Sequence, residues 1–271
     1  MGAFYEVLSP SLIAWVLEQH MFWVASAPLS GDGHVNVSPK GGKYFGVDDE
    51  RTFWYQDLTG SGNETISHIH EPGNGRVTIL FNAFVGPPKI LRLWGKGRVL
   101  ENGSSEYEAF TRSHPNIDLI PGTRSIIKVD IHQVGTSCGF SVPYYDFKEY
   151  RPILNDFFAN KEKKFKAGDS TQSMDRYWAY KNAWSMDGLP GMKRGLAAAQ
   201  TENVAPIKKM VGPFAPAPGK YKTSSRSFSL EHMLLVALTC FIIGILAATH
   251  GADLVKGIQV GTKPKGAIWR R

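Results

Sequence analysis

Apolar and polar residues alternate in six short stretches of the chain, and this alternation predicts β-strands. The clearest stretch is 124–134, where Ile127, Val129 and Ile131 occupy every second position. Glycine, proline and aspartate separate the stretches, as at 29–33, which favours tight turns. The six predicted strands are 21–27, 34–38, 52–56, 76–84, 89–100 and 124–134.

Helical patterns are fewer and shorter. The predicted helices are 11–19, 64–71, 106–112, 144–158 and 174–184. Because most strands follow one another through hairpin turns, with two short helices inserted, an antiparallel barrel is favoured over a parallel α/β sheet. We therefore expect a mainly β fold: a six-stranded antiparallel barrel, followed by C-terminal helices.

A run without charged residues starts at Met233 and ends at Ala248, and it predicts a single transmembrane helix. Sixteen helical residues would extend about 24 Å, slightly less than the ~30 Å hydrocarbon core of a bilayer. The run is apolar on every face, although its length also fits a buried core helix. The expected partner of this segment is membrane lipid.

The pattern divides the chain into five parts. They are a barrel domain at 10–150, a helical extension of it at 151–200, a flexible basic linker rich in Pro and Gly at 201–229, the transmembrane helix at 230–252 and a basic tail at 253–271. The N-terminal residues have no secretory signal pattern. We expect an intracellular protein anchored by its C-terminal segment, with the barrel facing the cytosol.

Charge and cysteine content narrow the function classes. The formal net charge of +7 gathers on both sides of the apolar run, which fits anionic lipid better than nucleic acid. Cys138 and Cys240 cannot form a disulfide framework. His68 and His70 stand two positions apart on a predicted helix and point apart, so no metal site is expected.

Polar motifs cluster between Gly31 and Gly97 in a defined order. A Gly-rich hairpin leads into His-Val-Asn-Val-Ser-Pro-Lys at 34–40, then Phe-Trp-Tyr-Gln-Asp-Leu-Thr-Gly-Ser-Gly-Asn-Glu-Thr at 53–65 and Leu-Arg-Leu-Trp-Gly-Lys-Gly at 91–97. This order and spacing resemble the pyridoxamine 5'-phosphate oxidase-like split barrels, over roughly residues 10–140. The resemblance implies a split β-barrel, an FMN cofactor and a homodimer that completes the cofactor groove.

The resemblance also implies the residues that contact FMN. Lys40 ends the strand that lies along the flavin, Tyr55 and Gln56 contact its ring and ribityl chain, and the turn at 60–65 offers amides and hydroxyls to the phosphate. The candidate cofactor-binding residues are Asn36, Val37, Ser38, Lys40, Tyr55, Gln56, Ser61, Gly62, Thr65 and Arg76. Each has a structural alternative: Lys40 as a surface lysine, Tyr55 as a core residue, and the turn as an ordinary helix start capped by Asn63.

The chain departs from the oxidase pattern at informative positions. Ser61-Gly62 stands where the oxidase has an Arg-Lys pair, Ile90 replaces a glutamine, and the C-terminal Trp and Arg-x-His pattern is missing. We therefore do not expect synthesis of pyridoxal phosphate. The predicted function is a membrane-tethered, FMN-dependent oxidoreductase acting on an unknown small substrate. The alternative is a non-catalytic cofactor binder or scaffold that retains the barrel.

Overall fold

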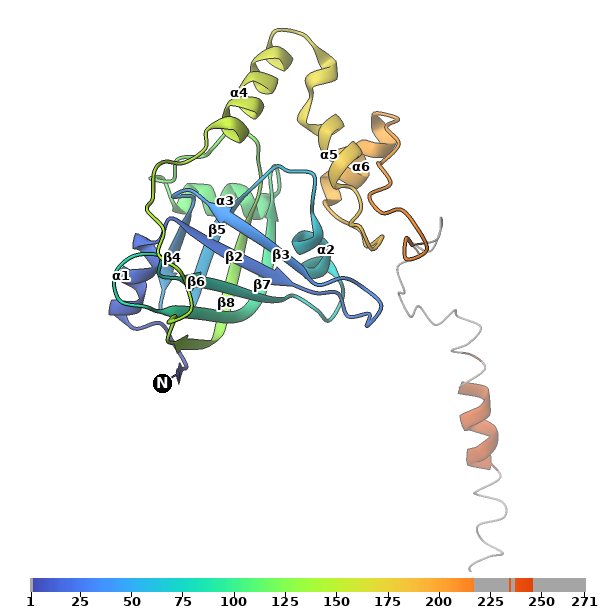
Figure 1. Cartoon of the computed structure of the whole chain (residues 1–271). Coiled ribbons are helices and arrows are strands. Elements are labelled where there is room, and N and C mark those ends of the chain that lie inside the picture. Colours follow the sequence, from blue (N-terminus) through green and yellow to red (C-terminus); the bar gives the residue numbers. More distant parts are fainter. Residues whose placement is uncertain (1, 217–233, 235–236, 246–271) are drawn as a thin grey trace, which may run out of the picture. The chain divides into compact units, whose positions relative to one another are not determined.

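The computed structural model describes residues 2–216, 234 and 237–245 of the chain. These residues belong to two units, Met1–Lys222 and Thr223–Arg271, each described by itself. The predicted linker lies outside the described residues from 217 onward, and the predicted tail lies wholly outside them. The first unit holds the sheet and all the helices labelled in Figure 1.

The first unit contains one antiparallel sheet of eight strands. Figure 1 labels β2 to β8 of this sheet. Its strands follow the order β3-β2-β6-β7-β8-β5-β4, with β1 paired to β8. Although β3 and β4 lie at opposite ends of this order, only residues 42–44 separate them along the chain, so the sheet must curve back on itself. The strands are β1 (Ala3–Tyr5), β2 (Met21–Ser26), β3 (Asn36–Gly41), β4 (Phe45–Asp49), β5 (Thr52–Leu58), β6 (Arg76–Asn82), β7 (Ile90–Glu101) and β8 (Thr123–Ser137).

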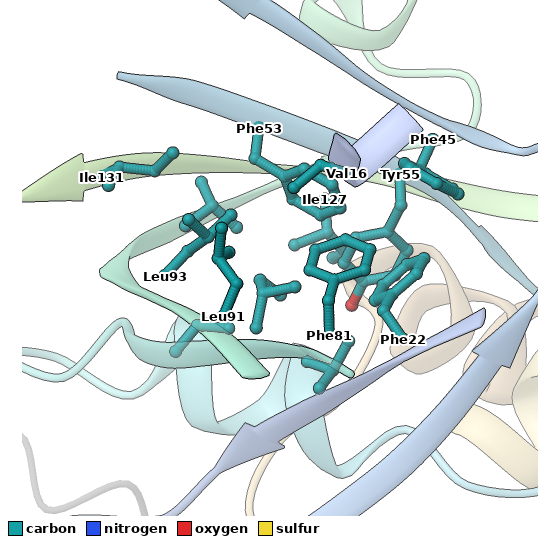
Figure 2. Packing of buried hydrophobic residues seen from close by; sticks show 14 of the residues in the cluster. Val16, Phe22, Phe45, Phe53, Tyr55, Phe81, Leu91, Leu93, Ile127 and Ile131 are labelled. Carbon is teal, nitrogen blue, oxygen red and sulfur yellow. The ribbon is translucent and has the colours of Figure 1, made fainter. Parts of the chain in front are cut away.

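The concave side of the sheet encloses an aromatic core (Figure 2). The ring of Phe22 lies 5.1 Å from that of Phe45, 5.4 Å from that of Phe53 and 5.4 Å from that of Phe81, measured between centroids. Three of these four side chains are at most 2% exposed. Fully burying one such side chain contributes ~1.5–3 kcal/mol, so this cluster is a main source of stability.

Helices cover the sheet and continue beyond it. Ser9 caps the first helix, because its hydroxyl accepts a hydrogen bond from the amide of Leu12 at 3.3 Å. The helix α3 covers the outer face of β5, where Phe110 packs against Trp54. The helices are α1 (Pro10–Glu18), α2 (Glu64–His70), α3 (Ser105–Ser113), α4 (Ile153–Lys166), the 3-10 turn η1 (Ser170–Gln172), α5 (Met174–Asn182) and α6 (Lys193–Thr201).

The fold is mainly β and its sheet is antiparallel, as predicted. The predicted number of strands was wrong, because the sheet has eight strands and not six. The missed strands are β1 and β4, which are short and contain no extended alternation: β4 ends in two aspartates. They form only because β8 and β5 offer free edges for pairing. The predicted helix at 144–158 begins only at Ile153, because Pro152 disfavours helical geometry in the residue before it. Helix α6 was not predicted.

The prediction of a transmembrane helix was also wrong. Among the described residues, no helix has both the length and the apolar character needed to cross a membrane. Within the run from Met233 to Ala248, helix is described at Leu234 and at 237–245, and the other positions lie outside the described residues. Nine helical residues extend about 14 Å, roughly half of a bilayer core. The structure therefore does not support anchoring to a membrane through this segment. It also does not support the cytosolic orientation of the barrel that was inferred from such an anchor.

Candidate functional site

A cavity of ≈ 380 Å³ lies between β3, at one end of the sheet, and β5, near the other. Strand alternation explains which side chains face it. On β3, Asn36, Ser38 and Lys40 share the more buried face, and on β5 Tyr55 and Asp57 share the face of the core residue Phe53. Eight of the ten predicted residues line the cavity: Asn36, Val37, Ser38, Lys40, Tyr55, Gln56, Gly62 and Thr65.

A buried ionic network joins the two sides of this cavity. Lys40 Nζ donates to Asp57 Oδ1 at 2.8 Å, and Arg124 Nε donates to Asp57 Oδ2 at 2.7 Å. The Asp57 side chain is 1% exposed and that of Lys40 is 21% exposed, so Lys40 is not the surface lysine of the structural alternative. Burial alone would raise the pKa of Asp57, but Arg124 and Lys40 favour the carboxylate and lower the pKa to about 2.

Arg124 reaches the cavity through an irregularity in the sheet. Asp57 pairs with Ser125 and Leu58 with Thr123, so Arg124 is an extra residue in β8. Such a bulge re-aims a side chain, and here Arg124 Nη1 also donates to the carbonyl oxygen of Gly62 at 2.7 Å. Sequence reasoning missed Arg124 and Asp57. The one available signal was a carboxylate within an otherwise buried strand, because nothing local marks the bulge.

Tyr55 carries an unsatisfied polar atom at the cavity. The residue is 1% exposed, and among the described residues its hydroxyl has no hydrogen-bond partner. Burial, with a further contribution from Asp57, raises the pKa of the Tyr55 phenol well above its ordinary value, so the hydroxyl is a neutral donor and acceptor. Lys40 Nζ lies 5.6 Å from the centre of the Tyr55 ring. A buried unpaired hydroxyl in a cavity wall is well suited to a polar group of a ligand.

Gln56 is engaged in structural hydrogen bonds. Its Nε2 donates to the carbonyl oxygen of Asp118 at 2.7 Å, and its Oε1 accepts from the amide of Ile120 at 3.2 Å and the hydroxyl of Thr123 at 2.9 Å. The side chain therefore holds the loop before β8. The contact of Gln56 with a flavin stays a prediction. Such a contact would use the backbone of Gln56, or the side-chain hydrogen bonds to the loop would have to break.

The turn before α2 is shaped by partners elsewhere in the chain. Asn63 Nδ2 donates to the carbonyl oxygen of Asn182 at 2.9 Å, and Asn182 Nδ2 donates to that of Gly60 at 2.9 Å. Asn36 Nδ2, from β3, donates to the hydroxyl of Thr65 at 3.1 Å. Asn63 makes no side-chain capping bond to α2, so its role is not that of an ordinary helix cap. The turn is an organised wall of the cavity.

Two predicted residues lie elsewhere. Ser61 is exposed and does not line the cavity. Arg76 lines a separate groove on the sheet, where its Nε donates to Asn74 Oδ1 at 3.2 Å and its Nη2 to the carbonyl oxygen of Pro28 at 3.3 Å. A phosphate in the cavity would therefore meet Lys40 and Arg124 rather than Arg76.

Comparison with solved structures gives weak likenesses. HupZ of Group A Streptococcus is 19% identical, with 48% of this chain and 98% of that chain covered at a TM-score of 0.35. The FAD-binding protein from Mycobacterium smegmatis is 15% identical, with 49% and 97% covered at a TM-score of 0.34. No family model matches this chain.

A curated relative gives a much stronger result. The protein of Aspergillus flavus described as "Pyridoxamine 5'-phosphate oxidase family protein ustO" is 38% identical over 200 residues, which are 71% of this chain and 78% of that protein. An identity of this size over most of both chains indicates common descent and confirms the resemblance drawn from the motifs at 31–97. The chain therefore belongs to the pyridoxamine 5'-phosphate oxidase family.

Proposed function

We propose that this chain binds FMN in the cavity between β3 and β5 and acts with it as an oxidoreductase on a small substrate. One observation carries the proposal: the cavity wall holds the buried hydroxyl of Tyr55, which has no hydrogen-bond partner among the described residues, and the ammonium of Lys40, 5.6 Å from the centre of the Tyr55 ring. The cavity volume of ≈ 380 Å³ falls within the range of about 300–1,000 Å³ that is usual for small-molecule sites. Family membership supports a flavin as the ligand.

The residues of the cavity suit different parts of the ligand. The ammonium of Lys40 has three N–H donors. One of them donates to Asp57, so two can donate to ligand oxygens. Tyr55 can donate to or accept from a polar ring edge. The amides of the turn at 60–65 and the hydroxyl of Thr65 can bind phosphate oxygens. Bound flavin supplies the electron-transfer chemistry, while these residues hold and orient it.

The electrostatic balance of this network favours an anion. Lys40 and Arg124 carry two positive charges against the single negative charge of Asp57, all within one hydrogen-bonded group. The net positive charge lies in a largely desolvated place, where its attraction for a phosphate is stronger than in water. Arg124 thus contributes charge that the missing Arg-Lys pair would have supplied at Ser61-Gly62.

The second candidate is a flavin binder without catalysis. It is favoured by the engagement of both cations with Asp57, which leaves less positive potential to promote electron uptake by a bound ring. The two candidates differ in one measurement. A catalytic protein, loaded with FMN and mixed anaerobically with NADH or NADPH, should lose its flavin absorbance within seconds to minutes. Retention of the oxidised spectrum with both donors would favour the binder.

FMN binding is tested by titrating wild type and the Lys40→Met variant with FMN. The quenching of flavin fluorescence measures the bound fraction. We expect the FMN affinity to fall about tenfold or more, because a charge-assisted hydrogen bond contributes ~1.5–3 kcal/mol. Thermal stability should fall as well, since Asp57 loses one of its two partners. The control is Lys163→Met, an exposed lysine of α4 outside the cavity lining. Equal affinity of both variants and wild type would place the flavin elsewhere.

We also propose a homodimer. The second groove, of ≈ 620 Å³, lies on the sheet and is lined by Phe4, Val35 and Trp94, among others. Phe4 and Val35 are each 72% exposed, so a second copy of the chain could bury an apolar surface there. Light scattering at micromolar concentration should give twice the chain mass of 30.0 kDa. A monomeric mass would contradict this.

A further inference from the structure

The wall of the cavity at 59–64 is built against residues far along the chain. Trp178 Nε1, on α5, donates to the hydroxyl of Thr59 at 3.0 Å. Gly191 packs so closely that a Cβ atom there would lie 1.8 Å from Asn63 Nδ2. The backbone amide of Met186 donates to Glu64 Oε1 at 3.2 Å. Helix α5 and the loop that follows it therefore shape this wall.

The segment after α6 reaches the same wall. The amide of Ile207 donates to the carbonyl oxygen of Tyr180 at 2.9 Å, which directs the segment back along α5. Lys209 Nζ then donates a hydrogen bond to Asn63 Oδ1 and lies 3.4 Å from Glu64 Oε1. The side chains of Lys209 and Glu64 are 13% and 12% exposed. Burial lowers the pKa of Lys209, whereas Glu64 favours its charged form.

This pairing matters because Glu64 lines the cavity. A carboxylate in the wall of a partly desolvated site repels an anionic ligand unless a cation compensates it. Lys209 is placed to compensate it, whereas Arg124 and Lys40 are already bonded to Asp57. The balance at this wall therefore depends on a residue 145 positions away from Glu64.

We propose that Lys209 is a positioning and specificity residue: its ion pair with Glu64 allows the cavity to accept a phosphorylated flavin rather than an uncharged one. The inference rests on the proposed flavin site and deepens it. It assigns the segment beyond α6 to that site, although in sequence this segment follows the barrel and resembles a linker. Neither Asn63 nor Glu64 need touch the flavin for this effect, because charge acts over several ångströms.

The test compares FMN with riboflavin, which lacks the phosphate, in the full chain. Dissociation constants are measured by flavin fluorescence for wild type, Lys209→Met, Glu64→Gln and the double variant. Lys209→Met should weaken FMN binding about tenfold and change riboflavin binding by less than about twofold. Glu64→Gln should strengthen FMN binding, and the double variant should restore it to near the wild-type value. The matched control is Lys208→Met, the exposed neighbour, which should change neither constant.

Each other result has a defined meaning. Equal weakening of FMN and riboflavin by Lys209→Met would overturn the inference, because it would show a purely structural clamp. Unchanged FMN selectivity in Lys209→Met would overturn it as well. If Lys209→Met does not fold, Glu64→Gln decides alone, since only the proposed repulsion predicts a gain for FMN over riboflavin. A wild type that binds neither ligand would defeat the proposed function itself, together with this inference.

Discussion

The substitution Asp57→Asn tests the ionic network that joins the two sides of the cavity. Asparagine keeps the shape of the side chain but removes its charge and one acceptor oxygen. Lys40 and Arg124 would then face a group with a single acceptor, and Arg124 is itself only 4% exposed. The variant therefore leaves two cations, one of them buried, without a compensating anion.

The expected loss of stability can be estimated in two ways. Removing one partner of a buried ion pair typically destabilises a protein by about 3–5 kcal/mol. Independently, the pKa of Asp57 falls from 3.8 to about 2, the effect of burial being outweighed by Arg124 and Lys40. At ~1.4 kcal/mol for each pH unit, ionised Asp57 contributes about 2–3 kcal/mol. We expect Asp57→Asn to lower the free energy of unfolding by about 2–5 kcal/mol at pH 7.

Urea denaturation between pH 7 and pH 2 measures this directly. A carboxyl whose pKa is lowered by folding stabilises the protein above its unfolded pKa, and that stability is lost as the pH falls through the folded pKa. Wild type should therefore lose about 2 kcal/mol between roughly pH 5 and pH 2, beyond the decline seen in Asp57→Asn. Asp130→Asn, which removes an exposed pair with Arg98, serves as the control and should change stability by less than ~1 kcal/mol. A loss below ~1 kcal/mol for Asp57→Asn, or the same acid decline in both proteins, would refute the reasoning.

Three further substitutions test other parts of the structure. Tyr55→Phe removes a buried hydroxyl that has no partner in the described part of the chain, so the melting temperature should stay equal or rise while FMN affinity falls; a clear loss of stability would show that the hydroxyl has a partner. Gly191→Ala should destabilise the chain by ~1–3 kcal/mol in urea, because its Cβ would lie 1.8 Å from Asn63 Nδ2. Phe53→Ala, at the centre of the aromatic core, should lower the unfolding free energy by ~3–5 kcal/mol, and a change below 1 kcal/mol would contradict the packing.

The strands with a regular period of two were predictable because the pattern is local. In β8, Ile127, Val129 and Ile131 face the core, as their alternation predicts. Short β4 lacks this pattern and exists because β5 pairs with it, so pairing and not propensity decides its conformation. The apolar run from Met233 to Ala248 shows the opposite error, in which composition alone predicted a spanning helix that the described residues do not contain.

The sequence by itself determined the antiparallel β character of the chain, its family, and the two strands that present Lys40 and Tyr55 to one cavity. Only the tertiary structure decided which charges meet there. Arg124 lies 67 positions from Asp57, and Lys209 lies 145 positions from Glu64. A β-bulge directs Arg124 toward Asp57, and the segment after α6 brings Lys209 to Glu64. Local patterns report which face of an element is buried, whereas ion pairs between distant segments depend on how the whole sheet curves and closes, and no short stretch of sequence encodes that.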